Sequence, residues 1–149
     1  MRIRLVHADD AEAVEELLGQ LGYPQDDTAA TADRIRRWGD DSASAAYVAE
    51  DEGALLGLVA VHVCPFFERA GSWARIVALV VSDRARRRGV GGRLVAAAEL
   101  FAAGQGCLRM EVTSADRRDD AHAFYRGRGY LDQAGTSTRF LRDLDRRGQ

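Results

Sequence analysis

The sequence predicts an α+β domain with a mixed, mostly antiparallel sheet of about seven strands, flanked by about four helices. β-rich runs separated by short turns fill residues 45–81, as in an antiparallel meander. A run with helical periodicity follows at residues 90–106, and another β-rich run comes after it. A crossover helix sets the strand after it parallel to the strand before it, so the sheet is mixed. With 149 residues and 46% hydrophobic composition, the chain has the size of one domain, which we expect over residues 1–149.

The first forty residues predict one strand and two helices. Apolar and polar residues alternate from Arg2 to His7, as a first strand requires. Asp9 or Asp10 offers an N-cap for a helix over residues 11–22, whose leucines and valine recur at helical spacing. A second short helix is expected from Thr28 to Trp38.

The middle of the chain predicts the meander and the crossover helix. Three strands are expected at residues 45–50, 53–63 and 73–81, and Gly53 lies where a tight hairpin requires glycine. From Val90 the period changes to that of a helix, which Gly104 and Gly106 close.

The last part of the chain predicts three further strands and one helix. A strand is expected at residues 107–114, and a short helix at 119–130 that Gly127 and Gly129 terminate. Residues 130–144 are expected to form a closing hairpin with its turn at Ala134 and Gly135. No internal repeat or linker interrupts this pattern.

Composition argues against several classes of protein. The net charge of -2 and the pI near 5.9 speak against nucleic-acid binding, which depends on a surplus of basic residues. Cys64 and Cys107 lie in apolar runs without partners at metal-ligand spacing, so we expect reduced thiols and no metal. No apolar run approaches the roughly 18 residues that cross a bilayer. All 21 basic residues are arginine, which is typical of a GC-rich genome, and we expect a cytoplasmic bacterial protein.

The stretch RRRGVGGRL, Arg86 to Leu94, predicts an anion-binding turn. It follows a strand and opens a helix, so its backbone N–H groups lie at a helix N-terminus, where free donors and the helix dipole favour negative charge. Glycines let a ligand approach the backbone, and arginines add charge-assisted contacts. The expected binding residues are Arg86, Arg87, Arg88, Gly89, Val90, Gly91, Gly92 and Arg93.

Two common phosphate-binding motifs do not fit this turn. A Walker loop requires a lysine, and the chain has none. The dinucleotide fingerprint begins at Gly89 and Gly91, but Leu94 occupies the position of its third glycine. Seven residues also separate the strand from Gly89, which is too long for the tight turn of that motif.

Two motifs resemble those of the GNAT superfamily, the acyl-CoA-dependent N-acetyltransferases. Arg86-x-x-Gly89-x-Gly91 is similar to the Arg/Gln-x-x-Gly-x-Gly/Ala signature of that family. AHAFYRGRGY resembles its Ala-x-x-Phe-Tyr-x-x-x-Gly-Phe/Tyr motif, through Ala121, Phe124, Tyr125 and Gly129. One helix and one strand separate the two motifs, as in the family, and the resemblance extends over about residues 45–144. It implies a GNAT-like sheet in which strand four bulges and splays from strand five.

The resemblance also implies a co-substrate and roles for particular residues. Acetyl-CoA would bind with its pyrophosphate on the glycine turn and its pantetheine arm along Leu79, Val80 and Val81. A backbone N–H near Leu79 or Val80 would polarise the thioester carbonyl. Tyr125 would contact the cofactor and protonate the leaving thiolate, because a phenol keeps its proton at neutral pH. Arg118 stands where the family often has an asparagine that contacts the cofactor.

The general base that prepares the amine has two candidates. Several family members carry a glutamate on the fourth strand, but residues 74–78 contain none. Glu111 on the fifth strand could accept the proton through water, and His62 is a second candidate.

The expected acceptor is a primary amine, more readily a small molecule than a protein, attacked directly in a ternary complex. Acidic residues near the first two helices would attract a cationic amine; they are Asp26, Asp27, Asp33, Asp40 and Asp41. An alternative is a sensor domain that holds acetyl-CoA without turnover, and a third class is an NAD-dependent enzyme. Similar proteins often pair, so the resemblance suggests a homodimer.

Overall fold

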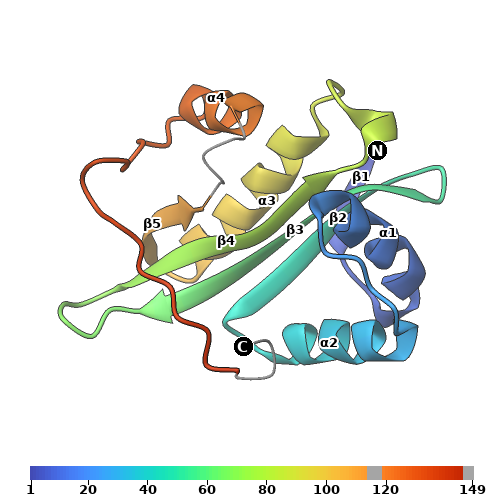
Figure 1. The fold of residues 1–149 in the computed structure, drawn as a ribbon, viewed down its shortest axis with the longest axis horizontal. Helices are drawn as coiled ribbons and strands as arrows, with labels where there is room; N and C mark the ends of the chain where they lie inside the picture. Colours follow the sequence, from blue (N-terminus) through green and yellow to red (C-terminus); the bar gives the residue numbers. More distant parts are fainter. Residues whose placement is uncertain (114–118, 146–149) are drawn as a thin grey trace. The chain divides into compact units, whose positions relative to one another are not determined.

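A computed structural model describes residues 1–113 and 119–145 of the chain (Figure 1). The chain forms two compact units, residues 1–113 and residues 114–149. The predicted single domain over residues 1–149 stays a prediction.

The first unit contains a five-stranded mixed sheet. Its strands, in spatial as well as chain order, are β1 (Arg2–Leu5), β2 (Ser44–Asp51), β3 (Ala54–Pro65), β4 (Ser72–Val81) and β5 (Cys107–Val112). Strands β1 to β4 are antiparallel, and β5 pairs in parallel with β4. The α+β class and the mixed sheet are confirmed, but the described residues hold five strands and not about seven.

Four α-helices accompany these strands in the described ranges, as predicted. They are α1 (Ala11–Leu21), α2 (Thr28–Asp40), α3 (Val90–Gly104) and α4 (Asp119–Gly127), with short 3-10 turns η1 (Ala8–Asp10) and η2 (Asp83–Ala85). None of the helices described is long and apolar enough to span a bilayer.

The two faces of the sheet are covered by different helices (Figure 1). On one face, Val48 and Leu58 pack with Val14 and Leu17 of α1 in a core cluster that α2 also contacts. On the other face, α3 comes so close to β3 that a Cβ built on Gly57 would lie 2.8 Å from Leu94 Cδ1. Alternate residues of a strand point to opposite faces, so Gly57 faces α3 while its neighbour Leu58 faces α1 and α2.

A cluster of charges joins β1 to the start of α1. Arg4 binds both carboxylate oxygens of Asp10 at 2.8 and 2.9 Å, and its Nε donates to Glu50 of β2. Asp10 also accepts from the backbone N of His7 at 2.8 Å. Asp10 therefore occupies the predicted N-cap position of α1 but makes no side-chain cap to that helix, because Arg4 and His7 occupy its oxygens.

The second unit contains α4 and the segment that follows it. The ring of Tyr125 meets those of Phe124 and Tyr130 edge to face, with centroids 5.3 and 5.8 Å apart. The predicted turn forms at Gly135, which has φ 82°.

The closing hairpin predicted over residues 130–144 is wrong. Backbone bonding after α4 stays local: Asp132 Oδ1 accepts from Ala134 N, and Gln133 O accepts from Thr136 N. The flanking residues form no strand. Phe140 is 91% exposed, so this segment does not bury the apolar face that a short hairpin needs for stability.

Candidate active site

The edge of β4 beyond Ile76 is unpaired on the side of β5. The parallel pairing of these strands runs from Ser72 opposite Cys107 to Ile76 opposite Val112, where β5 ends. Strand β4 continues to Val81. Its last five residues, 77–81, therefore have strand β3 on one side and no strand of the described chain on the other.

A β-bulge at Val77 marks the start of this open edge. On β3, Ala60 pairs with Ala78 and the next residue, Val61, pairs with Ile76, so that Val77 is the extra residue. A bulge shifts which side chains face which side of the sheet. It places Arg75, rather than Ile76, on the face of Ala78 and Val80, which is the face covered by α1 and α2.

Hydrogen-bond geometry shows which backbone groups of β4 face the open edge. Ser82 N donates to Leu56 O at 2.8 Å, which makes these two residues a hydrogen-bonded pair. Such pairs alternate along an antiparallel ladder, so Val80 bonds to β3 while Leu79 and Val81 turn their N–H and C=O groups outward. Of the three β4 residues predicted to bind the pantetheine arm, these two present free backbone groups.

The loop after β4 is anchored at its beginning. Ser82 is fully buried, and its Oγ accepts from Arg84 N at the start of η2. Asp83 N donates to Gln20 of α1 at 2.9 Å. Ala85 is also fully buried. These contacts fix the path by which the chain leaves β4 for α3.

The glycine turn ends in an open helix N-terminus. Gly89 has φ 77° and is the N-cap of α3, without a side-chain cap. Arg93 N makes the first helical bond, to Gly89 O, so the N–H groups of residues 90–92 have no helical acceptor. Arg87 also has positive φ, 65°, which is unusual for a residue other than glycine. This is the donor arrangement that an anion requires.

The arginines around this turn differ in their partners. Arg86 pairs with Asp83 at 3.0 Å, an exposed contact. Arg88 bonds to Asp51, the last residue of β2, at 3.0 Å, and Arg93 bonds to Met1 O at 3.1 Å. The Arg88 hydrogen bond is the main reason that the pKa of Asp51 lies below its usual value. Arg87 makes no ion pair with any residue that the structure describes, and is the arginine most available to a ligand.

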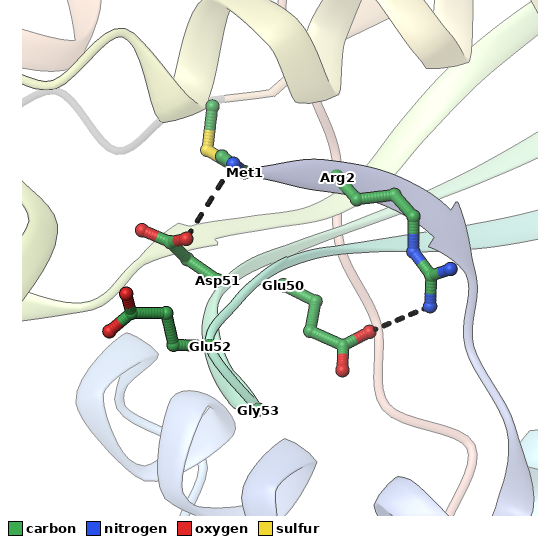
Figure 2. Close-up of a pocket in the computed structure, with 6 residues that line it drawn as sticks. All are labelled: Met1, Arg2, Glu50, Asp51, Glu52 and Gly53. Carbon is green, nitrogen blue, oxygen red and sulfur yellow. Dashed lines mark hydrogen bonds and ion pairs between the residues drawn. The ribbon is translucent and has the colours of Figure 1, made fainter.

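A small open pocket lies beside Asp51, between the start of β1 and the β2–β3 turn (Figure 2). Glu52 and Gly53 both have positive φ, 50° and 81°, as a two-residue type I′ turn requires. Carboxylates line the pocket, which makes it unsuited to an anion. The pocket residues are Met1, Arg2, Glu50, Asp51, Glu52 and Gly53, and no predicted site residue is among them.

Both candidate bases lie in one row of polar side chains across the sheet. Ser44, His62, Arg75 and Glu111 are register partners on β2, β3, β4 and β5, and we call them the polar row. Opposed residues share a face, so the row lies on the face of α1 and α2. Glu111 lies at the fork where β4 and β5 cease to pair, and His62 is two strands away.

Ser44 fixes the orientation of His62. Its Oγ lies 2.8 Å from His62 Nδ1 and 3.0 Å from Asp41 Oδ2. The carboxylate can only accept, so the serine hydroxyl donates to Asp41, and its Oγ can accept a hydrogen bond from His62 Nδ1–H. Hydrogen bonds from Ala43 N and then Ser44 lower the pKa of Asp41, which keeps the acceptor ionised.

The remaining predicted residues belong to other elements or fall outside the residues that the structure describes. Tyr125 is half-buried on α4 of the second unit, and Arg118 is outside the described residues. Asp27 caps α2 through Ala30 N, and Asp33 pairs with Arg36, so two of the acidic residues have local partners.

Sequence reasoning missed Arg75, Asp51 and the Asp41–Ser44–His62 chain. Arg75 was hidden because strict alternation through β4 puts it on the wrong face, and only the bulge reverses this. The buried residues Ala74, Ile76 and Val80 keep the alternation of a regular strand, so the bulge appears only in the pairing register and not in a local pattern.

Comparison with known proteins places the fold and the two motifs in a family. A sequence model of the acetyltransferase (GNAT) family matches residues 11–130. The chain therefore belongs to the GNAT acetyltransferase family, as its motifs indicated. A search of curated protein sequences gave no significant match.

Solved structures of other GNAT proteins share the fold. A protein of Agrobacterium tumefaciens strain C58 assigned as an acetyltransferase has a TM-score of 0.85 and 22% identity, covering 97% of this chain and 100% of its own. Glucosamine-6-phosphate N-acetyltransferase from Arabidopsis thaliana has a TM-score of 0.81 and 21% identity, and the match covers 97% of this chain and 98% of that protein. AAC(6')-Iy, solved with the bisubstrate analogue CoA-S-monomethyl-acetylneamine, has a TM-score of 0.79 and 18% identity, and the match covers 97% of both chains.

Proposed function

We propose that this protein is an N-acetyltransferase that moves the acetyl group of acetyl-CoA to a primary amine by direct attack in a ternary complex. The observation that carries the proposal is that the open edge of β4 leads directly, through an anchored loop, to the uncapped N-terminus of α3. Backbone donors for an extended arm and for an anionic group thus follow one another along the chain. Family membership supports the same reading.

The chain's own groups fit acetyl-CoA. Leu79 and Val81 would pair with the pantetheine arm, and the N–H groups at residues 89–92 would bind the pyrophosphate. Arg87 would add a charge-assisted contact. We place Arg86, Arg88 and Arg93 at the rim, where exchange of their present partners accompanies binding. Val80 contributes packing to the core cluster rather than a free backbone group. The role of Arg118 stays a prediction.

The co-substrate supplies an activated thioester, and the protein supplies orientation and proton transfer. The Leu79 N–H would donate to the carbonyl oxygen as negative charge develops there. The amine nitrogen forms a bond to the carbonyl carbon, the carbon–sulfur bond breaks, and the electron pair leaves with sulfur. Glu111 at the fork would take the amine proton through water, with His62 as the more distant candidate. Tyr125 would protonate the thiolate.

Changing Tyr125 to Phe tests the acid. We expect kcat to fall about 100-fold or more, because general acid catalysis contributes about 10²–10⁴-fold, while acetyl-CoA affinity changes little. Loss of thioester absorbance with a panel of primary amines measures turnover, and calorimetry measures affinity. Tyr130→Phe is the matched control, since it removes a hydroxyl from the neighbouring ring and should keep near-normal turnover.

Two results would contradict the proposal in different ways. Equal losses of turnover and of affinity in Tyr125→Phe would assign that residue to binding rather than to proton transfer. Tight acetyl-CoA binding without turnover of any amine would instead identify a sensor domain.

A further inference from the structure

The polar row contains one cation, Arg75, between two groups that can accept protons. It pairs in register with His62 on β3 and with Glu111 on β5, so all three side chains share the face of α1 and α2. They extend beyond the helices that cover this face: the exposed fractions of their side chains are 44%, 39% and 46% for His62, Arg75 and Glu111. A molecule in solution can reach all three.

The guanidinium of Arg75 is held in place and directed toward the open edge of β4. Its Nη2 donates to Thr113 Oγ1 at 2.8 Å. Strands β4 and β5 are parallel, and Arg75 is opposite Glu111. Thr113 therefore lies two residues beyond Glu111, just past the last β4–β5 pair at Val112. The side chain therefore leans from its own register position toward the bulge at Val77, where the free backbone groups of Leu79 and Val81 begin.

The charge of Arg75 is not satisfied by a hydrogen-bonded carboxylate within the described part of the chain. The nearest ion-pair partner is Glu111, whose Oε1 lies 3.9 Å from Nη1, beyond hydrogen-bonding distance. Thr113 is a neutral acceptor that uses one of five N–H donors. A planar fork with donors to spare, fixed by a neighbour, is the arrangement that binds carboxylate or phosphate in bidentate fashion.

We propose that Arg75 binds an anionic group, carboxylate or phosphate, on the acceptor, so that the substrate class is a primary amine that also carries an acid group. This inference rests on the proposed function, since it places the acceptor between the polar row and the open edge. The charge pattern is complementary to such a molecule: Arg75 takes the anion, and Glu111 at the fork attracts the amine. Because of the bulge, the segment from Arg75 to Leu79 matches only three residue steps of β3, from His62 to Val59, or about 10 Å, which an extended arginine and a small amino acid together span.

A purely structural role for Arg75 predicts something different. An exposed cross-strand ion pair contributes little to folding. If Arg75 only supported the sheet, its removal would change stability slightly and would affect all acceptors equally. Discrimination between acceptors with and without an anion is therefore the informative measurement.

The experiment compares matched acceptors with acetyl-CoA as donor. One arm uses the free L-amino acids against their amides, and the other uses aminoalkyl phosphates against the corresponding amino alcohols. For the wild type we expect a kcat/KM at least about 10-fold higher for the anionic member of one arm, and that arm identifies the anion. Arg75→Gln should lower this value about 10- to 100-fold and leave the neutral members within about twofold. Arg36→Gln, on the exposed surface of α2, is the matched control.

Calorimetry of the same acceptors with the CoA-bound protein separates the two proposals. Anionic acceptors that bind the wild type and not Arg75→Gln, without turnover, would overturn the proposed function and support this inference. Turnover that favours the neutral members, or an equal loss for both members in Arg75→Gln, would overturn the inference and leave the transferase proposal intact. Failure of every acceptor both to bind and to react would overturn both.

Discussion

At the scale of single residues, Gly57 controls how closely α3 approaches the sheet. A Cβ at this position would lie 2.8 Å from Leu94 Cδ1, 2.9 Å from Val80 O and 3.2 Å from Val90 Cγ1. One of these contacts is backbone, which cannot rotate away. Leu94 and Val90 belong to the first turns of α3, so the residue that crowds them also displaces the helix N-terminus that would bind the pyrophosphate.

Gly57→Ala is therefore expected to destabilise the fold and weaken acetyl-CoA binding together. Overpacking of this kind costs about 1–3 kcal/mol, which urea unfolding measures, and calorimetry should show weaker cofactor binding. Gly39→Ala is the control, because a Cβ there meets nothing within 4 Å and alanine favours the helix. Unchanged stability of Gly57→Ala would mean that α3 is not held as closely as the structure has it.

Residues also show where sequence reasoning succeeds and where it stops. The glycine turn could be predicted because three glycines and a helical period are local features, and the helix begins at Val90 as the period predicts. The position of Arg75 depends on one extra residue in a pairing register, which no local pattern specifies. Gly57 was equally hidden, because its need for glycine comes from a helix more than thirty residues away in the chain.

At the scale of elements, the Arg4–Asp10 contact fastens β1 to the start of α1. Hydrogen bonds from Arg4 are the main reason that the pKa of Asp10 lies below its usual value, and the backbone N–H of His7 adds to the effect. A carboxyl group whose pKa is lowered by folding stabilises the native state above its unfolded pKa of about 4. That contribution disappears as the pH falls through the lower, folded-state pKa.

Asp10→Asn should destabilise the protein by about 1–2 kcal/mol at pH 7, because Asn keeps an acceptor for His7 N but loses the charge that binds Arg4. The difference in unfolding free energy from the wild type should shrink below about pH 4 and vanish at more acidic pH. Urea unfolding across that range is the measurement. Asp33→Asn removes an exposed pair on α2 and should cost less than about 0.5 kcal/mol. A constant Asp10→Asn effect at every pH would show that the charge is irrelevant.

Among the elements, the strands and helices up to residue 112 could be predicted because each has its own periodicity and turn residues. Their observed bounds differ from the predicted ones by a few residues at most, as for α2, which ends at Asp40 instead of Trp38. The closing hairpin failed for a physical reason. Alternation around Gly135 permits two strands, but pairing requires a partner and a buried face, and neither is encoded in the alternation itself.

At the scale of the whole molecule, the charges are nearly balanced but unevenly placed. The net charge is only -2, and much of the positive charge around the glycine turn already has partners: Arg86 with Asp83 and Arg88 with Asp51. Attraction to a polyanion as such is thus weak. Binding of a diphosphate ester must therefore come from directed backbone donors and from the open edge of β4. These directed contacts, unlike net charge, discriminate between cofactors.

Ligand-linked stability tests this view of the molecule. A ligand that binds only the folded state, at a concentration 100 times its Kd, raises the unfolding free energy by about 2.7 kcal/mol. For a chain of this size, each kcal/mol raises Tm by about 2–4 °C. Acetyl-CoA should therefore raise Tm by about 5–10 °C, while NAD and inorganic polyphosphate change it little. Gly89→Val should abolish the shift, because φ 77° is strained for a β-branched residue and disrupts the N-terminus of α3. An equal Tm shift with NAD would mean that the turn binds anions by charge alone. An undiminished shift in Gly89→Val would mean that the cofactor binds elsewhere.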